Sequence, residues 1–255
     1  MKNKVTEVLP VLLIAILFSV WELVVYWLDI PRYILPAPSK VLSTIFNEAD
    51  VLFEETGYTT VEAMLGLGVG VIAAIFLGIF ASRFPLVEKT VMPIAIFVKV
   101  TPILAIAPLF AIWFGFGMTP RILIVAVVTF FPMLVNTIVG LRSTDKNTVD
   151  YMKSLGARES EIMFRLRIPF AAPYMFASLK ISVPLSVIGA VIGEWFGSNR
   201  GLGNLIMVSH GNLNMSTLFA SVFLLAFIGV VAISLISFIE KRVTFWHPTS
   251  ESIVS

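Results

Sequence analysis

Residues 122–141 read "ILIVAVVTFFPMLVNTIVGL", twenty consecutive residues without a charged side chain. About twenty mostly apolar residues form a helix long enough to cross the hydrocarbon core of a bilayer. Residues 218–239 form a second uncharged run of this kind. Across the whole chain 58% of residues are hydrophobic and only 13% are charged. Because so few charges cannot cover the apolar surface, the sequence predicts an all-α integral membrane protein.

Four further apolar segments bring the expected number of membrane spans to six. The first carries one acid, Glu22, which we expect at the interface beside an aromatic belt. Its apolar run continues past the length of a signal peptide without an A-x-A-like site, so we expect an uncleaved helix. The last contains Lys180 and Pro184, which makes it the weakest of the six. The four segments are residues 8–28, 63–81, 91–114 and 171–193.

The span at residues 91–114 contains Pro93, Pro102 and Pro108 and also carries Lys99. Proline inside a helix kinks or interrupts it. Irregular backbone at membrane depth is tolerated where it lines a cavity, although kinks also occur in purely structural helices. Lys99 either lines a pathway or extends to the cytoplasmic interface. Lys99, Pro102 and Pro108 are therefore candidates for a translocation pathway.

Glu194 is a second ionisable candidate, because it follows "VIGAVIG" at the outer end of the fifth span. Acids at such positions are often functional. It could line the pathway, cap the next segment or pair with Arg200.

Small residues recur every four positions along the second span. Gly66, Gly70, Ala74 and Gly78 form this stripe, which begins with a G-x-x-x-G pair. Such stripes let helix backbones approach closely. The pattern predicts either packing within one chain or a dimer or pathway face.

The Lys and Arg residues set the orientation of the spans. With a cytoplasmic N-terminus, twelve of the 18 lie on cytoplasmic segments and two, Lys99 and Lys180, fall within spans. The outer segments hold only Arg32, Lys40, Arg121 and Arg200. The asymmetry predicts that both termini are cytoplasmic.

The first outer loop, residues 29–60, begins with the proline-rich stretch "IPRYILPAPSK" and becomes acidic. The prolines favour extended backbone. Residues 41–53 that follow could form a short amphipathic helix on the outer surface, with Ser39 as its N-cap.

Nothing in the chain indicates chemistry of its own. There is no cysteine, and His210 and His247 lie too far apart to suggest a local metal site. P-loop and dinucleotide fingerprints are absent, so we expect no catalytic residue, metal or bound cofactor. A net charge of +2 gives no nucleic-acid surface. A protein of this kind conducts, transports or scaffolds.

Charge is concentrated in one cytoplasmic loop, around "SLGARESEIMFRLRIP" at residues 154–169. We expect one helix at residues 147–155, a turn at Gly156 and a second helix at residues 158–167 that Pro169 stops. Mixed charges fit a protein partner better than a lipid surface. The predicted apolar faces consist of Val149, Met152 and Leu155 on the first helix and Ile162, Met163 and Leu166 on the second.

This loop resembles the EAA motif in the permease subunits of binding-protein-dependent ABC importers. Asp150, Tyr151 and Met152 stand in the E-A-A places. Three residues separate Met152 from Gly156, and nine more precede the closing Leu-Arg-Ile-Pro at residues 166–169, as in the motif. The triplet itself departs from the pattern, whereas the spacing matches it.

The resemblance extends over nearly the whole chain, to the nitrate, sulfonate and taurine subfamily. The similar stretches are "LPAPSKV", "TPILAIAPLFAIWFGFG", "FFPMLVNTIVGLRSTD" and "GEWFGSNRGLGNLI". One departure is Glu62, where many relatives carry a basic residue.

The resemblance implies a type I importer fold in a bacterial inner membrane. Residues 1–255 would form one membrane domain, with a peripheral helix at 1–30, a permease core at 58–240 and a coupling loop at 142–173. Two permease copies, as a homodimer, would form the pathway above two ATPase subunits that carry ATP and Mg²⁺. An extracytoplasmic binding protein would deliver the solute. ATP-driven closure of the ATPases would switch the pathway from inward-open to outward-open.

The resemblance also implies roles for residues. The coupling positions are Asp150, Tyr151, Met152, Leu155, Gly156, Ala157, Glu161, Arg165, Ile168 and Pro169. "GAVIGEWFG" and the terminal "FWHP" are more similar to permeases for thiamine-related pyrimidines or riboflavin than to those for sulfonate, taurine or nitrate. The alternative function is an ion-coupled secondary transporter or a channel.

Overall fold

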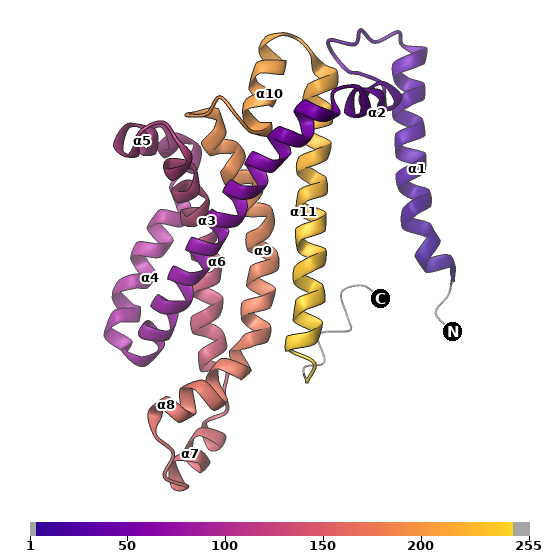
Figure 1. The fold of residues 1–255 in the computed structure, drawn as a ribbon. Helices are drawn as coiled ribbons and strands as arrows, with labels where there is room; N and C mark the ends of the chain where they lie inside the picture. The colour runs from indigo at the N-terminus through magenta and orange to yellow at the C-terminus, as the bar shows by residue number, and fades with distance from the viewer. Residues whose placement is uncertain (1–3, 247–255) are drawn as a thin grey trace. The chain divides into compact units, whose positions relative to one another are not determined.

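The computed structural model describes residues 4–246, in which all regular secondary structure is helical (Figure 1). This confirms the expected all-α fold. Lys2, one of the twelve cations counted as cytoplasmic, and His247 lie outside the described residues. The helices are α1 (Lys4–Trp27), α2 (Pro38–Asn47), α3 (Ala49–Arg83), α4 (Pro85–Val100), α5 (Ile103–Phe114), α6 (Met118–Arg142), α7 (Lys146–Ser154), α8 (Glu159–Ile162), the π-helical turn η1 (Met163–Arg167), α9 (Ile168–Trp195), α10 (Leu202–Gly211) and α11 (Met215–Val243).

Five helices in the described part are long and apolar enough to cross a membrane: α1, α3, α6, α11 and the segment Glu159–Trp195 that ends with α9. The pair α4 and α5 supplies a sixth span if it is counted as one. The expected number of about six is therefore confirmed.

The described residues divide into two compact units. The first contains the residues up to Tyr58 and Arg200–Ala226, and the second contains Thr59–Asn199 and the residues from Phe227 on. Helices α3 and α11 each contribute one part to each unit.

In the second unit, α3 and α6 pack against each other along the small-residue stripe. Gly66 lies against Val125, Gly70 against Thr129 and Gly78 against Thr137. Each step along α3 is matched by an equal step in the same direction along α6, so the two helices run parallel in a fixed register. A side chain in place of these glycines would hold the helices apart.

A methyl group added at Gly70 should destabilise this contact. In Gly70→Ala the new Cβ would lie 2.6 Å from the backbone oxygen of Ala126, so the helices must separate. We expect a loss of about 1–3 kcal/mol in unfolding free energy, as for overpacked cores. Gly68→Ala is the matched control, because nothing lies within 4 Å of a Cβ there. Thermal unfolding in detergent measures both, and equal melting temperatures would contradict the close approach.

Helix α6 also packs against α9, which runs in the opposite direction. Gly193 and Gly189 of α9 lie against Arg121 and Val125 of α6, and Gly140 near the far end of α6 lies against Ala171. Helix α9 continues through its internal prolines.

Lys180, which the sequence places within the fifth span, forms an ion pair with Glu240 of α11. Both side chains are largely buried. The pairing explains how this span tolerates a cation.

The expected span at residues 91–114 is two helices whose axes differ by 100°. Thr101 and Pro102 both have extended backbone. At Thr101 the cause is Pro102, because a proline disfavours helical geometry in the residue before it. The predicted interruption is therefore confirmed at Pro102. At Pro93 and Pro108 the helices continue through the proline.

The first outer loop differs from its prediction. The expected helix at residues 41–53 is instead α2 and the beginning of α3. Ser39 is not an N-cap: Ala37 holds that position, and Pro38 begins α2 with a φ that suits a first helical residue. The expected span at 63–81 is the later part of α3, which is 35 residues long.

In the first unit, α2 packs on α3 and α11 through Val41, Leu52 and Ala220. Helix α1 contacts α11 through Trp21, whose ring lies against Phe219 and Phe223. These contacts hold α1 and α2 to the rest of the first unit.

Candidate functional site

The charged loop forms the predicted helix–turn–helix. Asp145 is the N-cap of α7, and its carboxylate accepts a hydrogen bond of 3.1 Å from the backbone N–H of Thr148. Gly156 has a φ of +80°, a conformation that a side chain disfavours. Its backbone N–H donates a hydrogen bond to the carbonyl oxygen of Lys153, and the N–H of Ala157 donates to the carbonyl oxygen of Met152. The glycine therefore closes α7 and reverses the chain.

Apolar side chains hold the two arms together. Val149 and Met152 of the first arm pack against Ile162 and Leu166 of the second. The predicted faces differ at two positions. Leu155 follows the last residue of the helix and is 69% exposed, and Met163 belongs to a different core.

The second arm is joined to the spans by a separate core. Met163 packs against Leu141 of α6 and Ala171 of α9. Figure 1 shows α7 and α8 at one end of this helix pair. The loop is thus attached to two long helices of the second unit.

Pro169 does not stop the second arm, so that prediction was wrong. The chain passes from α8 through η1 directly into α9, where Pro169 is in the first turn. The N–H of Ile168 donates to Met163 in the wider π-helical pattern. A π-helical turn lets the axis continue past a residue that lacks an N–H. A rotation of the loop therefore acts on α9 without an intervening flexible segment.

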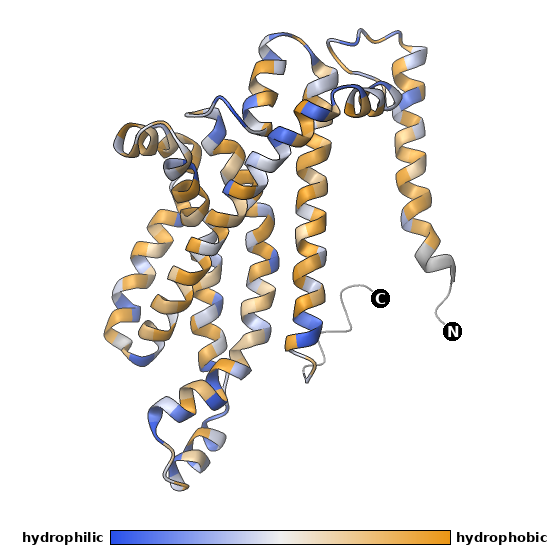
Figure 2. Ribbon diagram, viewed as in Figure 1, coloured by the Kyte–Doolittle hydropathy of each residue, from blue (hydrophilic) through white to orange (hydrophobic). Residues whose placement is uncertain are grey.

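The exposed surface of the loop combines apolar and charged groups. Tyr151, Leu155 and Phe164 are each at least 65% exposed. Lys153 pairs with Glu159 at 3.0 Å across the turn, and Glu161 accepts a hydrogen bond of 2.9 Å from the N–H of Arg158. Figure 2 shows hydrophilic residues on both arms, unlike the mainly apolar α6. Such a surface fits a protein groove.

A cavity of about 620 Å³ lies beside the break between α4 and α5. Lys99 and Pro102 line it, and α6 and α9 complete its wall. The ammonium of Lys99 lies 4.8 Å from the ring centre of Phe131, and Asn136 adds an amide to the lining. The cavity therefore offers a cation, an amide and an aromatic face.

The other two pathway candidates lie elsewhere in the second unit. Pro108 is inside α5, next to the buried Ala107. Glu194 is fully buried and accepts a hydrogen bond of 2.6 Å from the hydroxyl of Thr59. Neither is among the residues that line the cavity.

Sequence reasoning did not find the buried ion pair between Glu62 and Arg121. Glu62 is fully buried, and Arg121, which we expected in an outer segment, is almost fully buried. Arg121 also donates to the hydroxyl of Ser198 at 2.9 Å and to the backbone oxygen of Gly117 at 2.7 Å. The unusual acid at position 62 therefore has a specific partner.

The register of α3 and α6 explains this pairing. Glu62 and Arg121 are 59 positions apart in the sequence. The same separation holds between Gly66 and Val125, which are in contact one helical turn further on. In the sequence, this pair is indicated only by opposite charges near the corresponding ends of two spans. That indication can be used only when the register of the two helices is known.

Comparison with known proteins gives the family. Residues 66–245 match the family of the binding-protein-dependent transport system inner membrane component. The chain belongs to this family. It is a permease subunit of an ABC importer and a multi-pass membrane protein.

Two relatives and one solved structure are informative. The permease is 30% identical to a formylaminopyrimidine transport permease protein of Halalkalibacterium halodurans, over 97% of this chain and 99% of the relative. It is 29% identical to a riboflavin transport system permease protein of Chloroflexus aurantiacus, over 94% and 90% of the two chains. The methionine ABC transporter MetNI, in an inward-facing conformation, has a chain with the same fold, with a TM-score of 0.58 and 17% identity over 80% of the permease and 97% of that chain.

Proposed function

We propose that two copies of this permease form the pathway for a small solute delivered by an extracytoplasmic binding protein. Two ATPase subunits, which bind ATP and Mg²⁺, drive the switch between inward-open and outward-open states. The observation that carries the proposal is the helix–turn–helix loop, which continues through η1 into α9. A rigid connection of this kind transmits a rigid-body movement.

The loop is the proposed ATPase contact. Tyr151, Leu155 and Phe164 would enter a groove of the ATPase, because they are exposed while the other apolar side chains of the loop hold its arms together. Asp150 and Arg165 would set the orientation by charge pairing. This surface would face the cytoplasm, and both termini would then lie on the cytoplasmic side of a bacterial inner membrane.

The cavity beside the break between α4 and α5 would form part of the translocation pathway. An interrupted helix that borders a cavity is a common arrangement in transport proteins. Lys99 and Asn136 would hydrogen-bond a polar solute, and Phe131 would stack on a flat ring.

We propose a thiamine-precursor pyrimidine as the solute, with riboflavin as the next candidate. Both contain a flat heteroaromatic ring, which suits Phe131 and Asn136. The names of the two relatives support the same choice. A sulfonate, taurine or nitrate would use Lys99 and have no need of an aromatic face.

Reconstitution tests the function. Permease, ATPase and binding protein in liposomes should take up labelled formylaminopyrimidine only when ATP and the binding protein are present. Uptake by the permease alone under an ion gradient would instead support a secondary transporter. A channel would release the label in both directions without ATP.

Removing the aromatic face should weaken transport. In Phe131→Ala the solute loses a stacking partner worth about 0.5–1.5 kcal/mol, so we expect kcat/KM for uptake to fall about two- to tenfold. Phe227→Ala is the matched control, because Phe227 is exposed on α11 and does not line the cavity. Equal uptake by the two variants would exclude the cavity from the pathway.

A further inference from the structure

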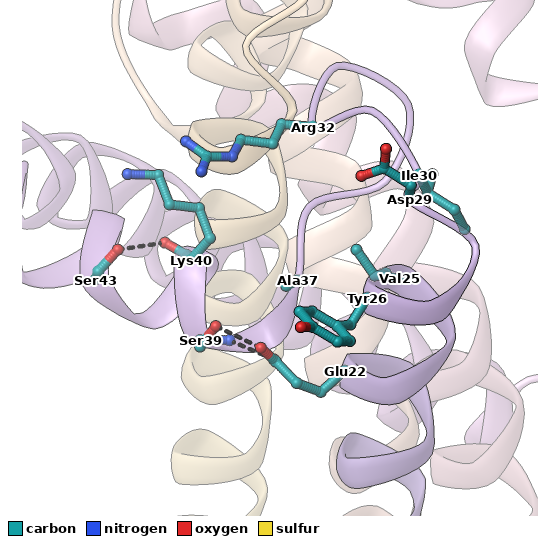
Figure 3. A pocket seen from close by; sticks show the side chains of 10 residues that line it. All are labelled: Glu22, Val25, Tyr26, Asp29, Ile30, Arg32, Ala37, Ser39, Lys40 and Ser43. Atoms are coloured by element: carbon teal, nitrogen blue, oxygen red, sulfur yellow. Dashed lines mark hydrogen bonds between the residues drawn. The ribbon is translucent and has the colours of Figure 1, made fainter.

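A cleft of about 430 Å³ lies in the first unit, where α1 ends and α2 begins (Figure 3). Two carboxylates and two cations line it, and none of them belongs to the proposed pathway or coupling loop. The charged residues are Glu22, Asp29, Arg32 and Lys40.

Glu22 has a structural role in this cleft. Its carboxylate accepts a hydrogen bond of 3.0 Å from the backbone N–H of Ser39 and one of 2.6 Å from the Ser39 hydroxyl. It therefore satisfies a free N–H in the first turn of α2, which Ala37 at the N-cap cannot do. This leaves Asp29 as the carboxylate available to a ligand.

Asp29 occupies a position that normally disfavours an acid. Its φ of +45° is left-handed, and the N–H of Ile30 bonds back to the oxygen of Val25 as in a glycine-terminated helix end. The residue also adds negative charge at the negative end of the α1 dipole. Aspartate tolerates the left-handed conformation, but a neutral glycine or asparagine would avoid the unfavourable charge. An acid whose charge opposes the helix dipole is a candidate functional position.

The cleft also holds the two outer cations that lack an ion pair. Arg121 pairs with Glu62, and Arg200 pairs with Glu54 and Glu55, which raises the pKa of Arg200. Among the described residues, no ion pair involves Arg32 or Lys40. Figure 3 shows both side chains reaching the same end of the cleft, with Asp29 on the other side.

The surroundings place this cleft at a membrane surface. Only 6% of the apolar window of α1 is buried. Tyr26 and Trp27, at the end of this helix, are each 81% exposed, as in the aromatic belt at a bilayer interface. A lipid headgroup beside α1 would lie at the level of the cleft.

We propose that the cleft binds the headgroup of a phosphatidylethanolamine molecule. Arg32 and Lys40 bind its phosphate, and Asp29 accepts hydrogen bonds from its ammonium. The cleft matches this zwitterion in charge, with a cationic end and an anionic end. A purely anionic headgroup would leave Asp29 beside a second negative charge, and a choline headgroup has no N–H to donate.

Native mass spectrometry of the purified permease tests this with three lipids of identical acyl chains. We expect phosphatidylethanolamine to bind at least about fivefold more tightly than phosphatidylcholine or phosphatidylglycerol. In Asp29→Asn this preference should disappear while the melting temperature does not fall, because asparagine suits the left-handed position. In Arg32→Gln with Lys40→Gln, binding of all three lipids should weaken about tenfold.

A matched control and a soluble ligand complete the test. Lys89→Gln with Lys146→Gln removes two exposed cations elsewhere and should leave lipid binding unchanged. Equal binding of the three lipids by the unmodified permease, or an unchanged preference in Asp29→Asn, would overturn the proposal. So would binding of glycerophosphoethanolamine as tightly as the intact lipid, because the site would then be for a soluble solute.

Discussion

Replacing Arg121 by methionine should lower the unfolding free energy of the permease by about 3–5 kcal/mol, the usual result of removing one partner of a buried ion pair. Glu62 is fully buried, and the oxygen Oε2 of its carboxylate already lacks a hydrogen-bond partner within the described residues. Without Arg121 the charge of Glu62 would have no ion-pair partner among the residues that the structure describes. Chemical or thermal unfolding in detergent measures the loss.

The double variant Glu62→Leu with Arg121→Met separates the ion pair from simple packing. Because it removes both charges, we expect it to recover most of the stability that the single variant loses. Lys89→Met, at an exposed position, controls for the change in composition. If the double variant is as unstable as Arg121→Met, packing around the arginine is responsible and the ion pair is not.

Replacing Gly156 by valine should reduce ATP-driven uptake more than tenfold while the ATPase subunits retain their own activity. The backbone at Gly156 has a φ of +80°, which a β-branched residue adopts only at a cost of about 1–2 kcal/mol or more. The turn would relax and α7 would move away from α8. Uptake into liposomes and binding of the ATPase subunits are the two measurements.

Gly156→Asn is the matched control, because asparagine tolerates the left-handed conformation. No atom lies within 4 Å of a Cβ at this position, so either side chain has room. We therefore expect the asparagine variant to keep most of its uptake. Equal loss in both variants would show that the side chain blocks the ATPase contact directly and that turn geometry is not the cause.

Several elements could be predicted from local sequence, because local chemistry determines them. The apolar runs predicted the spans, Pro102 predicted the break, and Gly156 predicted the turn of the loop. The predicted helix end at Pro169 was wrong. A proline stops an ordinary α-helix, whereas the π-helical turn η1 lets the helix continue past Pro169. The N-cap prediction at Ser39 was wrong because Pro38 begins α2 two residues earlier than a cap at Ser39 would.

The sites depended on contacts between distant segments. The cavity combines Lys99 and Pro102 with residues of α6 and α9, and sequence distance gives no measure of such proximity. Glu194 stays a candidate pathway residue, and only the structure shows that its carboxylate is buried and accepts a hydrogen bond from Thr59. The cleft around Asp29 could not be predicted, because it depends on the left-handed backbone at the end of α1. An aspartate in the sequence does not by itself indicate that conformation.

The sequence by itself determined that this chain spans a membrane, where its helices break and which loop resembles a coupling motif. Those properties follow from hydrophobicity, proline and glycine, which act over a few residues. Only the tertiary structure decided the register in which α3 runs beside α6. That register turned Glu62 and Arg121, two isolated charges in the sequence, into one buried pair, because close helix packing brings residues together by depth and not by order along the chain.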